Sequence, residues 1–211
     1  MKLALPPPGT LVPNNEHDPL PYYYRPLTGW LYRKRLQMGL DLIPPRATKV
    51  LEVGVGSGIL VPTLSARFAE YVGADLELAG GLAKLVAPAC HAEFITGDLL
   101  RESTLPAGAF DVVICLSVLE HIADADGAAA ALARTLVKGG TLIAGYPMVN
   151  RLMTRLFGLV GFGNIDDHHV TTPASIDKAL RRVLRPGRRK ALPPFMPVPL
   201  ALYQCTAWTK A

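Results

Sequence analysis

The chain has 211 residues, half of them hydrophobic, and a net charge of +5, which together indicate a globular protein with one substantial core. No stretch reaches the ~18 uninterrupted apolar residues of a membrane-spanning helix, and Pro6-Pro7-Pro8 leaves too short an apolar start for a secretory signal. The three cysteines lack metal-binding spacing, so we expect no metal site and reduced thiols in a cytoplasmic protein. Attachment to a membrane surface stays open.

Charge is distributed unevenly along the chain. Residues 50–146 hold five Lys or Arg against eleven Asp or Glu, whereas the flanks hold 17 basic and six acidic residues. Such asymmetry indicates that the two regions meet different partners. The acidic centre suits a cationic cofactor, and the basic flanks suit an anionic acceptor or a membrane surface. The alternative is that surface arginines only keep an apolar protein soluble.

The predicted elements follow one another in a regular order. Residues 1–21 contain six prolines and no periodicity, which predicts an extended arm. Apolar and basic residues then alternate at helical spacing until Pro44 and Pro45 end that helix. Strands are predicted at 49–53, 71–74, 92–96, 110–116 and 141–146, with helices at 59–69, 76–87 and 123–137. This alternation predicts an α/β fold with a doubly wound, parallel sheet covered by helices on both faces.

The pattern changes after Asn150. An apolar helical stripe at 152–160 is followed by a glycine-rich turn, by Asp166-Asp167-His168-His169 and by a helix that opens at Pro173. A basic cluster at 181–190, a proline-rich stretch and a last strand at 201–209 complete the chain. The stripe and the apolar stretch 192–202 suit a hydrophobic acceptor or a membrane interface. Packing of the stripe on its own sheet is the alternative.

A glycine-rich turn links the first predicted strand to the following helix. Such a turn is a general nucleotide-binding device, because glycines admit a ligand close to the backbone and a helix N-terminus offers free N–H groups. Here Gly54, Gly56 and Gly58 have GxGxG spacing, and Ile59 replaces the last glycine of the dinucleotide fingerprint. Glu52, just before the turn, would repel a pyrophosphate and attract an ammonium or sulfonium group. The cofactor that this charge favours is S-adenosylmethionine (SAM) rather than NAD.

Two further acids end the next two predicted strands. Asp75 lies 21 residues after Gly54, where an acidic side chain can accept both ribose hydroxyls. Asp98 can accept from the adenine amino group. An ordinary loop acid is the alternative for either position, but three acids at three successive strand ends favour a cofactor site.

These motifs resemble those of class I SAM-dependent methyltransferases, particularly the small-molecule and lipid group that includes the ubiquinone and menaquinone methyltransferases. The matching stretches, in the expected order, are residues 50–58, 73–75, 97–98, 105–106, 110–113, 117–122 and 136–142. The resemblance implies a Rossmann-like sheet of seven strands, mostly parallel, whose last strand is antiparallel. It also implies one domain at 22–211, with a SAM-binding core at 48–147 and acceptor-side elements at 22–45 and 150–172.

The resemblance assigns roles around the glycine turn. Glu52 would sit near the methionine amino group, directly or through water. The turn, with Gly54, Gly56 and Gly58, would make room for the methionyl and ribose portions of SAM. Asp75 would hold the ribose.

The same resemblance extends to the later strand ends. Asp98 and Leu99 would meet the adenine, while Leu116 and Ser117 would line the methionine end through backbone groups. Leu76 is a departure, since the family often carries Ser beside the ribose-binding acid.

Catalytic residues are expected to be few, because methyl transfer mainly needs alignment, exclusion of water and a deprotonated acceptor. The base candidates are His168 and His169, since imidazole titrates near the working pH, and bonding to the neighbouring aspartates is the alternative. His121 is a further candidate, against a structural role at a helix start. Tyr24 and Arg25 would close over SAM, with Arg25 facing its carboxylate; simple packing is the alternative.

The acceptor class is narrowed by motifs that the chain lacks. Residues 116–119 replace the Asp/Asn-Pro-Pro-aromatic quartet of DNA amino methyltransferases, which argues against DNA. RNA stays open, although aromatic and basic residues interleave only at 22–35. We therefore predict a SAM-dependent methyltransferase for a small, apolar and anionic metabolite or lipid. The alternatives are a non-catalytic SAM-binding module for regulation or scaffolding, an NAD-dependent oxidoreductase and an aminopropyl transferase.

Overall fold

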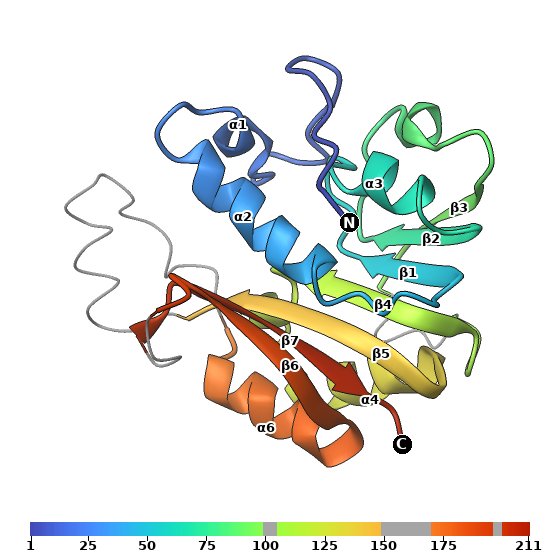
Figure 1. Cartoon of the computed structure of the whole chain (residues 1–211), viewed down its shortest axis with the longest axis vertical. Coiled ribbons are helices and arrows are strands. Elements are labelled where there is room, and N and C mark those ends of the chain that lie inside the picture. The colour runs from blue at the N-terminus through green and yellow to red at the C-terminus, as the bar shows by residue number, and fades with distance from the viewer. Residues whose placement is uncertain (99–104, 149–169, 196–199) are drawn as a thin grey trace.

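The structure, a computed structural model, describes residues 1–98, 105–148, 170–195 and 200–211 (Figure 1). Seven strands of the described residues form one sheet in the order β3-β2-β1-β4-β5-β7-β6. Their bounds are β1 Lys49–Val53, β2 Glu70–Asp75, β3 His91–Thr96, β4 Phe110–Leu116, β5 Leu136–Pro147, β6 Arg185–Leu192 and β7 Tyr203–Thr209. Neighbouring strands from β3 to β5 are parallel, and β7 runs antiparallel to both β5 and β6. The predicted α/β class, the seven strands and the antiparallel last strand are confirmed.

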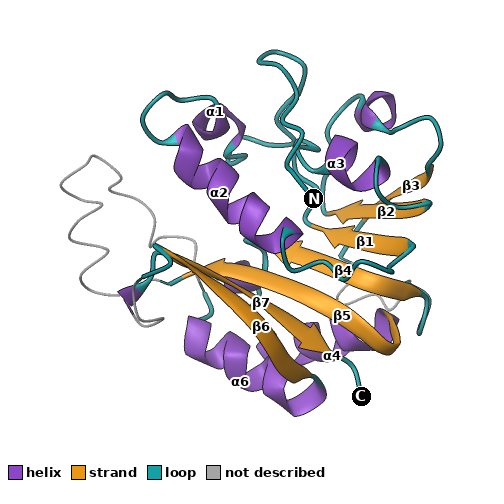
Figure 2. Cartoon of the chain, viewed as in Figure 1, coloured by secondary structure: helices purple, strands orange, loops and turns teal. Residues whose placement is uncertain are grey.

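Helices cover both faces of the sheet (Figures 1 and 2). The helices α2 (Gly29–Leu40) and α3 (Val61–Ser65) lie on one face, and α4 (Ala125–Thr135) and α6 (Pro173–Val183) lie on the other. Shorter elements are α1 (Leu20–Tyr23) and the 3-10 turns η1 (Leu82–Leu85) and η2 (Leu119–His121). No helix of the described residues is long and apolar enough to cross a membrane.

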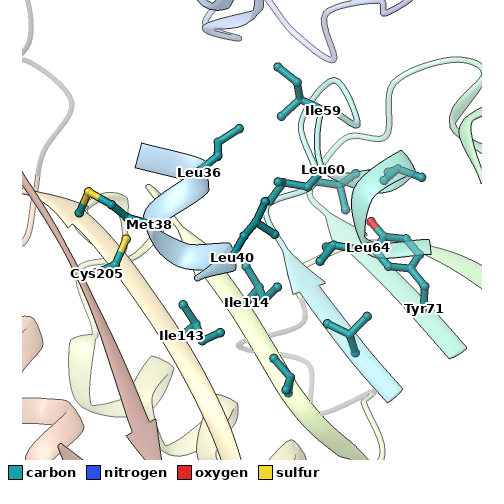
Figure 3. Packing of buried hydrophobic residues seen from close by; sticks show 14 of the residues in the cluster. Leu36, Met38, Leu40, Ile59, Leu60, Leu64, Tyr71, Ile114, Ile143 and Cys205 are labelled. Atoms are coloured by element: carbon teal, nitrogen blue, oxygen red, sulfur yellow. The ribbon is translucent and has the colours of Figure 1, made fainter. Parts of the chain in front are cut away.

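The central strands are apolar throughout because both of their faces are buried. Along β4, Val112 and Ile114 point into the cluster under α2 and α3, shown in Figure 3, while Val113 and Cys115 point into the cluster under α4 and α6. Trp208 of β7 lies fully buried in the second cluster. The sheet is therefore a rigid support, and its edge at the carboxyl ends of the parallel strands is free to carry a site.

Several predicted segments differ in the structure. The helix predicted at 59–69 is shorter, since α3 spans only Val61–Ser65, and the strand predicted at 141–146 begins at Leu136, directly after α4. The helix predicted from residue 22 is split, because Pro26 lies between the end of α1 and the start of α2. The helix predicted at 76–87 is reduced to η1, which Gly81 precedes in a left-handed conformation (φ +83°). The basic cluster at 181–190 divides into the end of α6 and the edge strand β6.

Residues 1–19 contain no helix or strand, and they pack along the domain between α2 and α3 (Figure 1). The backbone N–H of Leu3 donates to Gln37 of α2, and that of Ala4 donates to Thr63 of α3, both at 2.9 Å. Leu11 is buried in the cluster under these helices. The proline-rich arm is thus part of the folded domain.

Candidate functional site

The glycine turn follows β1 at the carboxyl edge of the sheet. Gly54, Gly56 and Gly58 all have positive φ angles, of 83°, 54° and 82°. Space is also short: a Cβ on Gly54 would lie 2.3 Å from a methyl group of Val118. A side chain at Gly54 would therefore have to displace the loop after β4, and only glycine satisfies both the backbone and the packing.

Asp75, the last residue of β2, is tied directly to this turn. Its Oδ2 accepts the backbone N–H of Gly56 at 2.7 Å, and its Oδ1 accepts that of Glu77 at 3.4 Å. The side chain is half-buried, and the neighbouring Leu76 is exposed. The structure therefore brings together the predicted ribose-binding acid and the middle glycine of the turn.

Glu52 lies beneath the turn and is almost completely buried, with 3% of its surface exposed. The Tyr71 hydroxyl donates to its Oε2 at 2.6 Å. Burial raises the pKa of Glu52 to about 8; Asp75 raises it further, and the Tyr71 hydrogen bond opposes the rise. The carboxyl group is thus mostly protonated at neutral pH, and a cation placed beside it would favour its ionised form.

The end of β4 forms the next side of the site. Ser117 has a φ of +58°, and its hydroxyl lies 3.0 Å from the Tyr203 hydroxyl of β7. Leu116 is covered by α2, where a Cβ on Gly39 would lie 3.0 Å from a methyl group of Leu116. The predicted methionine end is therefore lined by α2 and β7 as well as by β4.

Sequence reasoning missed the arginine that lies beside this end. The guanidinium of Arg35, on α2, lies over two tyrosine rings. Its Cζ is 4.2 Å from the ring centroid of Tyr32 and 5.2 Å from that of Tyr203. Its Nε is buried and has no hydrogen-bond partner among the described residues, although the guanidinium is hydrogen-bonded to the Tyr23 side chain. The available sequence signal is the interleaving of aromatic and basic residues over 22–35, which bears only on RNA binding and does not single out Arg35.

Glu120 of η2 was missed as well. It is 3% exposed, and its Oε2 has no hydrogen-bond partner in the described part of the chain. Burial raises its pKa to about 7, opposed by the charge of Arg35. A buried carboxyl oxygen and a buried guanidinium nitrogen without partners are costly, and both lie around the end of β4. A ligand that bonded both atoms would remove this cost.

The remaining candidates have other surroundings or lie outside the described residues. The Tyr24 hydroxyl donates to the carbonyl of Pro6, and Arg25 stacks on the ring of Tyr22 at 4.3 Å. His121 is exposed, next to the buried Glu120, and Asp98 follows β3. Leu99, His168 and His169 lie outside the described residues, so their predicted roles stay predictions.

The central part of the chain matches a known protein family. Residues 51–144 match the family described as "Methyltransferase domain". These residues form a class I methyltransferase domain. The match spans the glycine turn, the acids at the ends of β2 and β3, and the end of β4, and it confirms the family that the motifs predicted.

Two curated relatives of the chain carry the same name. The chain is 34% identical over 166 residues to the "Ubiquinone biosynthesis O-methyltransferase" of Psychrobacter arcticus, covering 70% of this chain and 60% of that protein. It is 35% identical over 119 residues to the protein of that name from Alkalilimnicola ehrlichii, covering 54% and 47%. The chain thus spans about half to three fifths of the length of these relatives.

Solved structures of low identity show the same fold. The N-methyltransferase NodS from Bradyrhizobium japonicum, in complex with S-adenosyl-L-homocysteine, matches with a TM-score of 0.63 at 17% identity, over 92% of both chains. A TehB-like SAM-dependent methyltransferase from Corynebacterium glutamicum matches with a TM-score of 0.60 at 18% identity, over 82% of this chain and 85% of that one. At these identities the matches establish the fold of the methyltransferase domain.

Proposed function

We propose that this chain transfers a methyl group from SAM to an oxygen of a small, apolar and anionic acceptor. The observation that carries the proposal is the set of groups at the carboxyl edge of β1, β2 and β4. Asp75, Glu52 and Arg35 offer there the three polar functions that match the ribose, the ammonium and the carboxylate of SAM. The family membership of residues 51–144 supports the same cofactor.

On the cofactor side, each group has unused bonding capacity. Asp75 uses Oδ2 to bond the glycine turn, and the weaker 3.4 Å bond of its Oδ1 leaves that oxygen to accept from ribose hydroxyls. Arg35 has a buried Nε without a partner, so an incoming carboxylate would remove the cost of leaving it unbonded. Arg35 therefore replaces Arg25 as our candidate for the carboxylate of the methionine end.

On the acceptor side, the transfer needs a group that takes the proton of the attacking hydroxyl. SAM supplies an electrophilic methyl group whose departure leaves a neutral sulfide. The free Oε2 of Glu120 lies at the same edge, and a pKa of about 7 is suited to proton transfer near neutral pH. Glu120 joins His168, His169 and His121 as a candidate base.

An apolar, anionic acceptor is supported by the surface. Leu27 and Phe195 are more than four-fifths exposed, and Trp30 is more than half exposed. The flanks of the methyltransferase domain carry most of the basic residues. The names of the curated relatives support a hydroxyl group on a small molecule as the accepting atom. We also propose that residues 22–45 and 150–172 cover the acceptor; most of the second segment lies outside the described residues.

The test is transfer of labelled methyl groups from SAM to a cell extract, with Asp75→Ala as the inactive control. The proposal is supported if label appears in the organic small-molecule fraction and if treatments that cleave methyl ethers release it. Label confined to protein or nucleic acid would contradict the proposed acceptor class. Binding of S-adenosylhomocysteine without any transfer would favour the non-catalytic module instead.

A further inference from the structure

A buried hydrogen-bonded pair lies beneath the glycine turn, across strands β1 and β2. Tyr71 is fully buried, and its hydroxyl donates to Glu52 Oε2 at 2.6 Å. In the register of the two strands Tyr71 lies opposite Val50, and Glu52 lies opposite Gly73. The two side chains therefore occupy diagonal positions on one face of the sheet. Only a long side chain such as tyrosine can bridge the distance between such positions.

The surroundings hold the tyrosine hydroxyl in this place. A Cβ on Gly73 would lie 2.8 Å from the Tyr71 hydroxyl, so the missing side chain of Gly73 provides the space that the hydroxyl occupies. The ring packs edge-on against Phe94 at 5.7 Å and belongs to the apolar cluster below α3 (Figure 3). A phenylalanine ring would pack in this cluster equally well, so packing does not explain why the residue carries a hydroxyl group.

We propose that the Tyr71 hydroxyl is a positioning group for cofactor binding: it fixes the Glu52 carboxyl through Oε2 and keeps Oε1 for the methionine ammonium of SAM. The inference rests on the proposed function, because it assumes that Glu52 meets the ammonium. Tyr71 itself does not contact the cofactor. Its effect passes through the orientation and the charge of Glu52.

The charge of Glu52 is set by a small group of neighbours. Tyr71 and Asp75 of β2 face it, and Cys90, before β3, acts on Tyr71. The Tyr71 hydrogen bond lowers the pKa of Glu52, whereas burial and Asp75 raise it. An ammonium needs the ionised carboxylate, so binding near neutral pH should release a proton from Glu52, and affinity should rise with pH up to about 8.

The variant Tyr71→Phe removes only the hydroxyl and should raise the pKa of Glu52 further. A rise of about one unit corresponds to about a tenfold loss of affinity for S-adenosylhomocysteine at pH 7. At pH 9.5 the loss should shrink to less than about twofold, because both proteins then carry the ionised carboxylate. The ligand's own amine also titrates in this range, but it affects both proteins equally and therefore cancels in the ratio of their affinities.

The experiment is calorimetric titration with S-adenosylhomocysteine at both pH values, in two buffers of different ionisation enthalpy so that released protons are counted. The matched control is Tyr146→Phe, which removes a fully buried tyrosine hydroxyl from the opposite cluster and should leave affinity unchanged at both pH values. A second variant, Glu52→Gln, should bind weakly with no dependence on pH between 7 and 9.5 beyond that of the ligand. Thermal unfolding of each variant checks that it is folded.

The outcomes separate the two proposals. A Tyr71→Phe loss that is concentrated at pH 7 and accompanied by a changed proton release supports the inference. An equal loss at both pH values, or no loss, overturns it while leaving SAM binding intact. Absence of binding by the unmodified protein and by Tyr146→Phe would instead contradict the proposed function.

Discussion

At the scale of single residues, the proposed site holds two of the six buried side-chain polar atoms that have no partner among the described residues. Arg35 Nε and Glu120 Oε2 lie around the end of β4, where the methionine end and the acceptor are proposed to meet. Burial without a hydrogen bond lowers the stability of the ligand-free protein, and a ligand that bonds these atoms would offset that cost. These two residues therefore offer the sharpest tests of the site.

Replacing Arg35 with lysine should weaken binding of S-adenosylhomocysteine about tenfold, since an ammonium lacks the planar set of donors that holds a carboxylate with two bonds. The stacking on Tyr32 and Tyr203 would be lost as well. Calorimetric titration measures the effect, and Lys34→Ala, an exposed position on the same helix, serves as the control. Unchanged affinity in Arg35→Lys would remove Arg35 from the cofactor site.

Glu120→Gln should reduce kcat by at least about 100-fold, the usual contribution of a general base. The carboxyl must be ionised to accept a proton, so activity of the unmodified protein should fall as pH drops below about 7. A pH profile of kcat/KM measures both effects once an acceptor is found. If the variant keeps the acid limb of the profile, the proton is taken by another group, with His168 and His169 as the remaining candidates.

At the scale of elements, the start of β4 is linked to the start of β1 by one carboxylate. Asp111 Oδ2 accepts from the backbone N–H of Thr48 and of Lys49 and from the Thr48 hydroxyl, at 2.8 to 3.0 Å. These bonds lower the pKa of Asp111. They join two central strands at the edge of the sheet opposite the site.

Asp111→Ala should therefore lower the free energy of unfolding by about 1–3 kcal/mol without changing affinity for S-adenosylhomocysteine. Because the pKa of Asp111 is lowered in the folded state, this stabilisation should be present at neutral pH and lost as pH falls below about 4. Urea unfolding at pH 7 and pH 3.5 measures the difference, with the exposed Glu93→Ala on β3 as the control. A difference as large at pH 3.5 as at pH 7 would contradict this role of Asp111.

Several central strands are predicted well from sequence because their burial is nearly uniform. Strands β1, β2 and β4 are apolar runs covered on both faces, so hydrophobicity locates them, whereas β5 begins with partly exposed residues and is predicted only from residue 141. The edge strand β6 carries exposed arginines, together with Pro186 and Gly187, and resembles a loop in its sequence. Charges on an edge strand disfavour pairing with the edge of another sheet. They also interrupt the apolar pattern by which a strand is recognised in sequence.

The same contrast applies to the candidate site. The glycine turn and Asp75 belong to short contiguous motifs, so the order of residues along the chain is enough to identify them. Arg35 and Tyr203 are far apart in sequence and meet only because α2 crosses the ends of β4 and β7. No local pattern encodes that crossing, and the spacing of apolar and basic residues in this segment predicts a helix without indicating which residue would meet Tyr203.

At the scale of the whole molecule, two buried acids make stability depend on pH. The pKa of Glu52 is raised to about 8 and that of Glu120 to about 7, above the values that both would have in the unfolded chain. Their contribution to stability is therefore complete at acidic pH and is lost as pH rises from about 4.5 through 8. Between pH 6 and pH 8.5 each acid contributes on the order of 1–3 kcal/mol to this change.

The ligand-free protein should accordingly unfold at a lower temperature at pH 8.5 than at pH 6, by about 2–4 °C for each kcal/mol lost. The double variant Glu52→Gln and Glu120→Gln should flatten this dependence while abolishing activity. Calorimetric scans across the pH range measure it, with Glu93→Ala as the comparison. A ligand-free protein whose unfolding temperature is constant across this range would show that the two carboxyl groups are not buried as described.

The arm at residues 1–19 has a consequence for the order in which the molecule assembles. Leu3 and Ala4 bond to side chains 34 and 59 residues further along the chain, on α2 and α3. Gln37 is positioned by the packing of α2 and Thr63 by that of α3, so docking of the arm closes long loops. We therefore expect the segment that precedes every other element in sequence to join the domain late in folding, after both helices have packed on the sheet.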